Sequence, residues 1–383
     1  MYLSAQQVHS MTKETLREFV SLRLAEGLYL DYKEALSDLS EKESQREFLK
    51  DVTAFANSAG GDLLLGVKEP NDNISTDNQL AGLHDGESLA QDLERLASTS
   101  VDPRIPGLRI KYVSLGNTRS CIVVHIPPSL SRPHMVNHQG HRAFYIRHSE
   151  SSVPMTTHEV REAVLTSASA EARARQRVER RLMEVQELVG RLKAAFLLQA
   201  VPLIAPETSW NVLDPSFERA LRGDSRRNRY LISLASDVAP RPTIDGLLGR
   251  DGRDSPTWET EVHRTGYVSA FYRKVQVERI GEVDQFVVHT GYCDFFRAFC
   301  ELLKEVWVAA NDDLPYLISC AYLNAVGTRL WTQSILQKYS DPYEKREIVW
   351  PEHLRSPGED PITIAEALCT ELFNAVGYKE VIK

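Results

Sequence analysis

The sequence has few cysteines, and their spacing suits neither cross-linking nor metal binding. There are five in 383 residues, an odd number, far apart, with no C-x-x-C pair. This spacing argues against a disulfide framework and against structural zinc. Each cysteine has apolar neighbours, so we expect five buried small side chains: Cys121, Cys293, Cys300, Cys320 and Cys369.

The chain also lacks long hydrophobic runs and an excess of positive charge. No stretch of about 18 apolar residues occurs, and no charged-then-apolar leader follows Met1, so we expect no membrane span, no signal peptide and a cytoplasmic protein. A net charge of −8 argues against a protein that coats nucleic acid through overall charge. Any contact with nucleic acid therefore needs a local basic patch.

Common nucleotide-binding and hydrolase motifs are missing as well. The sequence contains no G-x-x-x-x-G-K-[ST], H-E-x-x-H, G-x-S-x-G or G-x-G-x-x-G. It therefore gives no sign of a P-loop, a zinc protease, a serine hydrolase or a dinucleotide site.

The length predicts more than one domain, because a single core seldom grows beyond roughly 250–300 residues. Composition shifts toward Ala, Arg and Glu at residue 168. We expect an α+β domain over 1–167, a connecting helix over 168–200 and a second α+β domain over 201–383.

Helical and strand periods alternate in the first domain. Four helices are expected, over Thr12–Ala25, Ser40–Ser58, Glu87–Ala97 and Thr156–Ala163. Strands are expected in LYLDYK, DLLLGV and the segments starting at 108, 120 and 142. Alternation in LYLDYK puts Asp31 and Lys33 on one face, and Gly60-Gly61 ends the second helix.

The connecting segment carries a short heptad pattern with steps of 4, 3, 4, 3 and 4: Val178, Leu182, Val185, Val189, Leu192 and Phe196. About three heptads are near the lower limit for a coiled coil. Self-association and packing on the following domain therefore both stay open, and the partner prediction includes a homo-oligomer.

The second domain offers periodic elements but no motif. Residues 237–256 are expected to be irregular, and 267–280 and 284–290 to form two antiparallel strands. A helix through Phe295 and Val306, a strand in PYLISCAYLNA and a helix over Ile362–Val376 follow. The aromatic residues fall at strand and helix periods, which indicates a core.

Three carboxylates, Glu26, Asp31 and Glu69, lie beside the ends of two expected strands, with Lys33 close by. Clustered carboxylates repel one another unless they hold a cation or share protons. Mg²⁺ and Mn²⁺ take such oxygen ligands and assist phosphodiester hydrolysis, with Lys33 on the phosphate. On spacing alone, ordinary solvated charges remain the favoured interpretation.

Two further groups have a functional and an ordinary interpretation. His134, His138 and His141, with His125 and His148 nearby, could bind a transition metal, but a polar loop is the favoured interpretation. A basic patch could hold a phosphate backbone, or could be a solvated strand face: Lys33, Lys111, Arg132, Arg142 and Arg147.

The runs E-G-L-Y-L-D-Y-K, F-A-N-S-A-G-G-D-L-L-L-G-V-K-E, V-V-H-I-P-P-S and F-Y-I-R-H-S-E-S-S-V-P-M resemble the Schlafen/AlbA-like domain family over roughly residues 10–165. The resemblance implies a mixed-sheet, nucleic-acid-associated domain. In the enzymatic branch it implies a divalent-metal endoribonuclease acting on structured RNA such as tRNA. Glu26, Asp31 with Tyr32-Lys33, and Glu69 stand where that branch places its acidic residues.

Two residues depart from the pattern that the resemblance implies. Asp31 stands where glutamate is commoner, and Lys68 where an acidic residue often follows Gly-Val, so the third carboxylate must be Glu69. Our leading hypothesis is a metal-dependent endoribonuclease with Mg²⁺ or Mn²⁺ on Glu26, Asp31 and Glu69. The alternative is a non-enzymatic DNA-binding or regulatory protein with the same fold.

Overall fold

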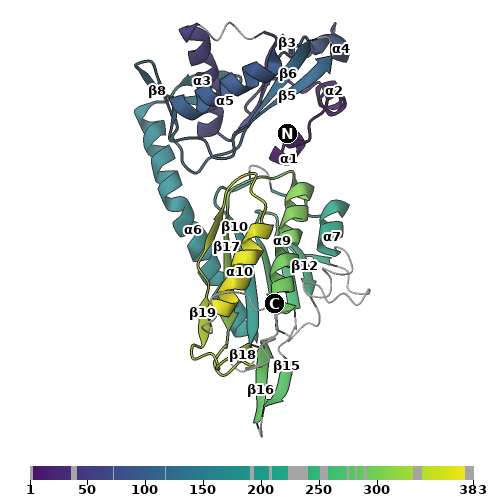
Figure 1. The fold of residues 1–383 in the computed structure, drawn as a ribbon, viewed down its shortest axis with the longest axis vertical. Coiled ribbons are helices and arrows are strands. Elements are labelled where there is room, and N and C mark those ends of the chain that lie inside the picture. Colours follow the sequence, from purple (N-terminus) through teal and green to yellow (C-terminus); the bar gives the residue numbers. More distant parts are fainter. Residues whose placement is uncertain are drawn as a thin grey trace. The chain divides into compact units, whose positions relative to one another are not determined.

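The computed structural model divides into two compact units (Figure 1). The N-terminal unit comprises Met1–Ala170 with two short segments, Asp313–Pro315 and Ser356–Glu359, and the C-terminal unit comprises the rest. The structure describes residues 3–35, 41–71, 73–116, 118–189, 194–206, 209–222, 240–250, 258–273, 276–280, 283–288, 291–330 and 339–375. The predicted α+β class, with a mixed first sheet, a long helix and a second β-rich domain, is confirmed.

The N-terminal unit contains a five-stranded mixed sheet, in which β1 and β2 are parallel and the other pairs antiparallel. Its strands are β1 (Leu30–Lys33), β2 (Gly61–Leu65), β3 (Leu83–His84), β5 (Arg109–Gly116) and β6 (Arg119–Ile126). A second sheet consists of β4 (Val101–Asp102), β7 (Met135–His138), β8 (His141–His148) and β9 (Ser151–Pro154). The helices are α1 (Ala5–His9), α2 (Lys13–Ser21), α3 (Lys42–Asn57), α4 (Thr76–Gln79) and α5 (Gly86–Ser100).

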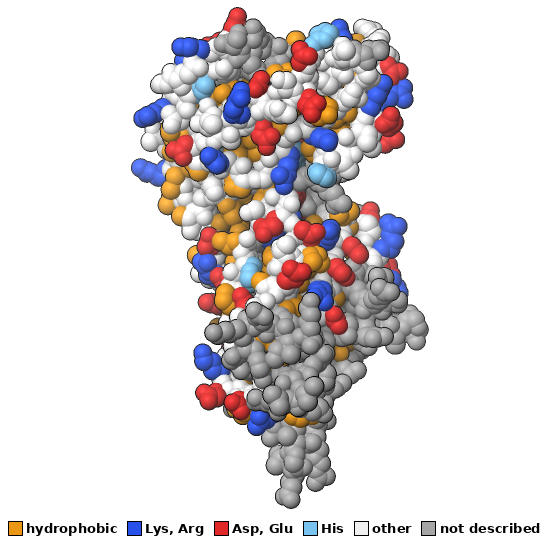
Figure 2. Space-filling view, in the orientation of Figure 1, with side chains coloured by type: hydrophobic (Ala, Val, Ile, Leu, Met, Phe, Trp, Pro, Cys, Tyr) orange, Lys and Arg blue, Asp and Glu red, His pale blue; other side chains and the backbone are white. Residues whose placement is uncertain are grey.

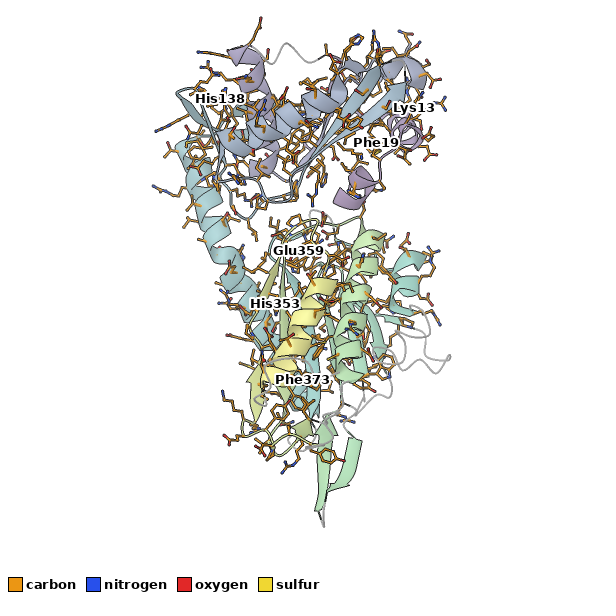
Figure 3. All side chains as sticks on the ribbon, in the orientation of Figure 1. Lys13, Phe19, His138, His353, Glu359 and Phe373 are labelled. Carbon is orange, nitrogen blue, oxygen red and sulfur yellow. The ribbon has the colours of Figure 1, made fainter. Side chains whose placement is uncertain are left out.

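Strand alternation divides the hydrophobic core of this unit between the two faces of the mixed sheet. Leu63 and Leu65 pack with residues of α3 and α5. Leu30, Tyr32 and Leu64 pack with residues of α1 and α2, including Phe19 of α2 (Figure 3). The side chains of Asp31 and Lys33 therefore share the face that α3 covers, as the alternation predicts.

The C-terminal unit is built on an antiparallel eight-stranded sheet. Its strands are β10 (Ala195–Pro202), β11 (Arg241–Pro242), β12 (Gly246–Arg250), β13 (Trp258–His263), β14 (Val268–Tyr272), β17 (Tyr316–Leu323), β19 (Glu347–Val349) and β20 (His353–Arg355). A smaller sheet contains β15 (Gln276–Ile280), β16 (Val283–Val288) and β18 (Arg329–Leu330). The remaining helices are α6 (Thr157–Val189), α7 (Pro215–Arg222), α9 (Gly291–Ala310) and α10 (Ile362–Asn374).

The long helix corrects two predicted boundaries. The helices expected over 156–163 and over the heptad segment are one helix, α6, which ends at Val189. Phe196, the last residue of the predicted seam, lies instead on strand β10. The run AFLLQAVP is apolar without alternation because both faces of β10 are buried, and such a strand cannot be told from a helix by periodicity.

The seam of α6 packs inside the C-terminal unit. Val185 is fully buried in a cluster with Leu197 and Leu323 of the sheet, and Leu182 packs against it. On the other face of β10, Phe196 contacts Phe296 of α9. Of the two alternatives for the seam, the structure shows the packing on the following domain; self-association stays a prediction.

Several strands fall where none is expected, and two of them lie in segments predicted to be a loop or irregular. β7 lies in the predicted polar loop before residue 142, and β12 lies in the predicted irregular segment 237–256. β7 is only four residues long and β12 contains two glycines, so neither shows a strand pattern in sequence. The antiparallel pairing expected near 280 is confirmed as β15 with β16, but the single strand expected over 267–280 is wrong, because β14 and β15 lie in different sheets.

Candidate carboxylate site

Glu26 and Asp31 converge on one backbone N–H group. Gly27 N–H donates to Leu30 O at 3.0 Å, which folds the chain back on itself just before β1. Tyr32 N–H then faces Glu26 Oε1 at 3.0 Å and Asp31 Oδ1 at 3.1 Å. A tight turn between two acidic residues therefore places both carboxylates at the same point on the edge of the sheet.

Two cations neutralise Asp31. Lys33 Nζ lies 3.0 Å from Asp31 Oδ2, and its side chain is 43% exposed. Arg147 Nη1 lies 3.6 Å from the same oxygen, and its side chain is only 1% exposed. The guanidinium also donates to Gly27 O at 2.7 Å, so the buried Arg147 holds the turn and Asp31 together.

Asp51 of α3 is a fourth acidic residue of this region, and sequence reasoning missed it. It is buried and accepts a hydrogen bond from Ser152 Oγ at 2.9 Å. Burial raises the pKa of its carboxyl, against the opposing charge of Lys33. The signal was present, because Asp51 stands three residues after Phe48 and four before Phe55, within the apolar stripe of the helix.

The electrostatics of the site leave Glu26 partly protonated at neutral pH. Burial, a hydrogen bond with the Asp31 carboxyl and the charges of Asp31 and Glu69 together raise the pKa of Glu26 to about 7, against the Tyr32 N–H. Burial alone would lower the pKa of Lys33, but the charges of Asp31, Asp51 and Glu26 outweigh it and raise that pKa. Lys33 therefore stays cationic beside a carboxyl that holds a proton.

Glu69 lies on the loop after β2 and is exposed. Its charge acts on Glu26, whereas the preceding residue, Lys68, pairs with Glu34 at 2.8 Å. Among the residues that the structure describes, no group of three His, Cys, Asp or Glu side chains is arranged to hold a metal ion. The proton that Glu26 holds beside Asp31 is chemically suited to replacement by a cation, but Glu69 does not complete a ligand set in this conformation.

The five residues of the predicted basic patch do not share one surface. Lys111 pairs in register with Val123, which pairs with Leu64, and Leu64 with Tyr32. Register partners point to the same face, so Lys111 lies on the face opposite Asp31. Arg132 donates to Ser58 O at 3.0 Å, and Arg147 is buried. Arg142 is exposed on β8, but five residues from Arg147 it points to the other face of that strand, so Lys33 is the one partly exposed cation of the five beside Asp31.

Charges of both signs are interspersed on the visible face of the N-terminal unit (Figure 2).

The histidines of the predicted loop have separate partners. His134 faces Pro103 O, His138 (Figure 3) lies between Ser100 and Gln45, and His141 faces the Tyr145 hydroxyl. His125 pairs with the buried Asp62 at 2.9 Å, and His148 pairs with Glu159 at 3.0 Å. These contacts give each histidine a structural place in the fold.

The F-A-N-S-A-G-G segment joins α3 to the second sheet. Asn57 Nδ2 donates to His134 O and to Tyr145 O, and Asn57 Oδ1 accepts from His134 N–H at 2.6 Å. Ser58 Oγ accepts from Arg147 N–H at 2.9 Å. Gly60 takes a φ of 75°, where a Cβ would lie 2.6 Å from Ile126 O. The F-A-N-S-A-G-G residues, on which the family resemblance rests, therefore hold together the elements around the carboxylates.

Residues 26–156 match the family model described as Schlafen, AlbA_2, which confirms the resemblance expected for the N-terminal domain. Among solved structures, the chain is similar to the N-terminal domain of an ATP-dependent DNA helicase RecG-related protein from Nitrosomonas europaea, at 20% identity. That likeness covers 38% of this chain and 94% of the other, with a TM-score of 0.26, and supports no functional argument. No curated protein matches the chain.

All five cysteines are free and buried, as expected from their apolar neighbours. None of the helices in the described part of the chain has the length and hydropathy needed to cross a bilayer.

Proposed function

We propose that this chain, whose N-terminal domain is Schlafen/AlbA-like, acts on nucleic acid as a divalent-metal-dependent endoribonuclease that prefers structured RNA such as tRNA. The observation that carries the proposal is the convergence of Glu26 and Asp31 on one N–H group, with Glu26 raised to a pKa of about 7. Holding two carboxylates this close costs free energy, which a bound cation would offset. The match over residues 26–156 supports a nucleic-acid role but not a particular reaction.

In this proposal Glu26, Asp31 and Glu69 hold Mg²⁺ or Mn²⁺, with Glu69 moving inward from its exposed loop. A cation bound there would stabilise charge on a phosphate oxygen and lower the pKa of an attacking water. Lys33 transfers its ion pair from Asp31 to the phosphate, because its side chain is partly exposed and stays protonated. Arg147 does not touch substrate and is a positioning residue for Asp31.

The second candidate is a non-enzymatic DNA-binding or regulatory protein with the same fold. It is favoured by one observation, that Asp31 is already neutralised by Lys33 and Arg147 without a metal ion. Such a protein would bind duplex DNA with a steep salt dependence and cleave nothing.

Paired binding and cleavage assays distinguish the two candidates. Wild type, Asp31→Asn and Glu69→Gln are incubated with tRNA, single-stranded RNA and duplex DNA in the presence of Mn²⁺, and both bound and cleaved fractions are recorded. The nuclease proposal predicts cleavage of RNA by wild type and a loss of about 100-fold or more in either variant with most RNA affinity kept. Equal cleavage by all three, or binding without cleavage by wild type, would contradict it.

Asp92→Asn is the matched control, because it makes the same chemical change on the partly exposed side of α5, where Asp92 pairs with Arg95. Glu69→Gln guards against misfolding, since an exposed loop residue with no role in the core should leave stability unchanged.

A further inference from the structure

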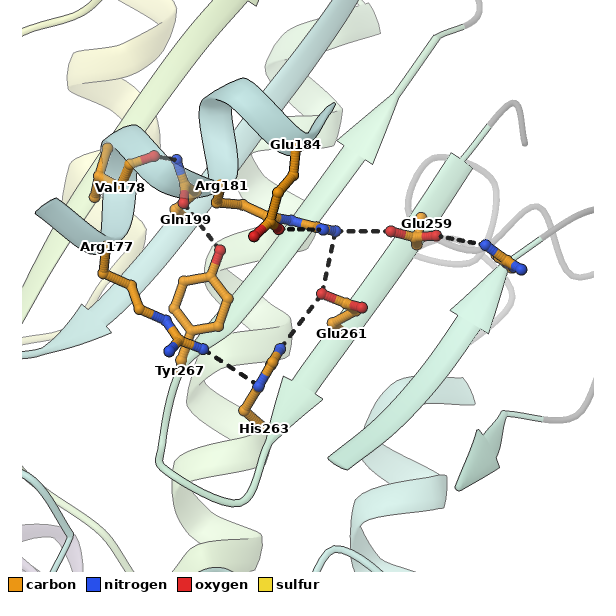
Figure 4. A network of polar contacts seen from close by, with 10 residues as sticks. Arg177, Val178, Arg181, Glu184, Gln199, Glu259, Glu261, His263 and Tyr267 are labelled. Atoms are coloured by element: carbon orange, nitrogen blue, oxygen red, sulfur yellow. Dashed lines mark hydrogen bonds and ion pairs between the residues drawn. The ribbon is translucent and has the colours of Figure 1, made fainter. Parts of the chain in front are cut away.

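A small polar pocket lies within the C-terminal unit, between α6, strand β13 and the turns that precede β12 and β14, and several of its residues are drawn in Figure 4. Its volume is about 250 Å³. From α6 it takes Arg177, Arg180 and Arg181, and from the sheet side it takes His263 and Tyr267. A space of this size admits a small organic molecule and no folded partner.

The floor of the pocket is fixed by buried hydrogen bonds. Tyr267 hydroxyl donates to Gln199 Oε1 at 2.9 Å, and Gln199 Nε2 donates to Val178 O at 3.2 Å (Figure 4). Tyr267 and Gln199 are both almost fully buried. The ring of Tyr267 is therefore held in place, and Arg177 Cζ lies 4.6 Å above its centroid. This floor of the pocket is ordered before any ligand binds, so binding loses little side-chain conformational entropy there.

Arg181 is the cation of the pocket that is already neutralised. Its Nη2 lies 2.7 Å from Glu259 and 3.1 Å from Glu261, and its Nη1 lies 3.2 Å from Glu184 (Figure 4). Burial tends to raise the pKa of the Glu261 carboxyl, but the His263 hydrogen bond and the charge of Arg181 outweigh it and lower that pKa. Arg181 is therefore neutralised by three carboxylates, of which Glu184 and Glu261 also line the pocket.

Arg177 and Arg180 are less neutralised than Arg181, although the charge of Arg177 also acts on Glu261. Arg177 Nη2 lies 3.3 Å from His263 Nδ1, and because a guanidinium only donates, this nitrogen accepts and the ring proton belongs on Nε2, which faces Glu261. Within the described ranges, no carboxylate lies at ion-pair distance from Arg177 or Arg180. At positions i and i+3 the two lie on one face of α6 and are suited to hold one oxyanion.

The rim of the pocket disfavours a polyanion. Glu184 is exposed on α6, and Asp245 is exposed in the turn between β11 and β12. These carboxylates would repel a second phosphate of a nucleic-acid backbone while accepting hydrogen bonds from hydroxyl or amino groups of a small ligand. The charge pattern therefore selects a single oxyanion on a compact molecule.

We propose that this pocket binds a small oxyanion-bearing metabolite, with the oxyanion held by Arg177 and Arg180 over the Tyr267 ring. The site is independent of the carboxylate site, since all its residues belong to the C-terminal unit. It gives that unit a ligand-sensing role whether or not the N-terminal unit cleaves RNA.

Calorimetric titration of the full chain with inorganic phosphate and with malonate, at constant ionic strength, tests the proposal. Wild type is expected to bind at least one of the two anions saturably, and Arg180→Gln and the double variant Arg177→Gln/Arg180→Gln to bind it about tenfold or more weakly, since each loses a charge-assisted hydrogen bond. Asp245→Asn should bind more tightly, because it removes a repelling charge from the rim. Arg161→Gln, an exposed arginine on α6 outside the pocket, is the matched control and should bind like wild type.

Arg180→Gln protects the test from misfolding, because Arg180 is exposed and far-UV circular dichroism should stay unchanged. The proposal is overturned if wild type binds neither anion saturably. It is also overturned if Arg180→Gln and the double variant bind the anion as tightly as wild type does. Binding of a single-stranded RNA that is lost in the double variant, with no binding of the small anions, also overturns it and assigns the arginines to a nucleic-acid surface.

Discussion

At the scale of single residues, the carboxylate site differs from its prediction in which groups support it. The sequence spacing located Glu26 and Asp31 correctly beside the start of β1, since strand alternation and a glycine turn are local. It missed Asp51, and it treated Arg147 as a surface cation although the guanidinium is buried against Asp31. Both depend on the contact of α3 with β8 and β9, which no local pattern contains.

The raised pKa of Glu26 predicts a pH-dependent stability. Because this pKa lies at about 7 and not at 4.5, the protonated carboxyl stabilises the fold at low pH, and that contribution is lost as pH rises from 4.5 through about 7. Glu26→Gln, which resembles the protonated form, should therefore gain stability relative to wild type across this range. Urea denaturation midpoints at about pH 5 and about pH 8 measure the effect.

Glu94→Gln, an exposed change on α5, serves as the control for that comparison. A difference between wild type and Glu26→Gln that stays constant with pH would show that Glu26 titrates normally. Addition of Mn²⁺ at about pH 8 should then stabilise wild type and not Glu26→Gln, because the cation replaces the proton.

At the scale of elements, the helix ends of the N-terminal unit were the most predictable features. The N-cap Thr12, the helix over α3 and its stop at Gly60-Gly61 all follow from local chemistry, and the structure confirms them. Less predictable were short or buried strands such as β7 and β10, whose pattern depends on what covers them.

Gly60 should tolerate alanine worse than a glycine with the same backbone conformation in open space. Gly60 and Gly140 both have positive φ, 75° and 83°, but a Cβ at Gly60 would lie 2.6 Å from Ile126 O, whereas at Gly140 it meets nothing within 4 Å. We expect Gly140→Ala to cost about 1 kcal/mol of unfolding free energy and Gly60→Ala about 2 kcal/mol or more, measured by urea denaturation. Equal losses would mean that the backbone around Ile126 moves freely.

At the scale of the whole molecule, the length predicted more than one domain, and the α+β class followed from the order of elements. The structure adds that α6 begins in one unit and ends in the other, with Val185 and Leu182 of the predicted seam packed in the C-terminal core. Leu192 of that seam lies outside the described residues. A three-heptad pattern cannot say which partner it faces, because an intramolecular sheet and a second helix demand the same spacing.

Leu182→Ala tests that packing against self-association. Since Leu182 packs on a cluster that includes Val185, truncation should lower the free energy of unfolding by about 2 kcal/mol or less, given its partial burial. The molar mass measured by light scattering should stay that of wild type at the same concentration. A lower mass in the variant would show that the seam also joins two chains.

Met183→Ala is the matched control, because its side chain is 62% exposed on the same helix. It should change neither stability nor mass. The molar mass of wild type in solution tests the predicted homo-oligomer directly, because a monomer mass would contradict it.

The most direct test of the central claim is the single-turnover rate of tRNA cleavage with Mn²⁺, compared between wild type and Glu69→Gln. The proposal predicts a wild-type rate that rises with Mn²⁺ and falls by about 100-fold or more in Glu69→Gln, with Asp92→Asn unchanged. No metal-dependent cleavage by wild type, or the same rate in Glu69→Gln, would contradict it.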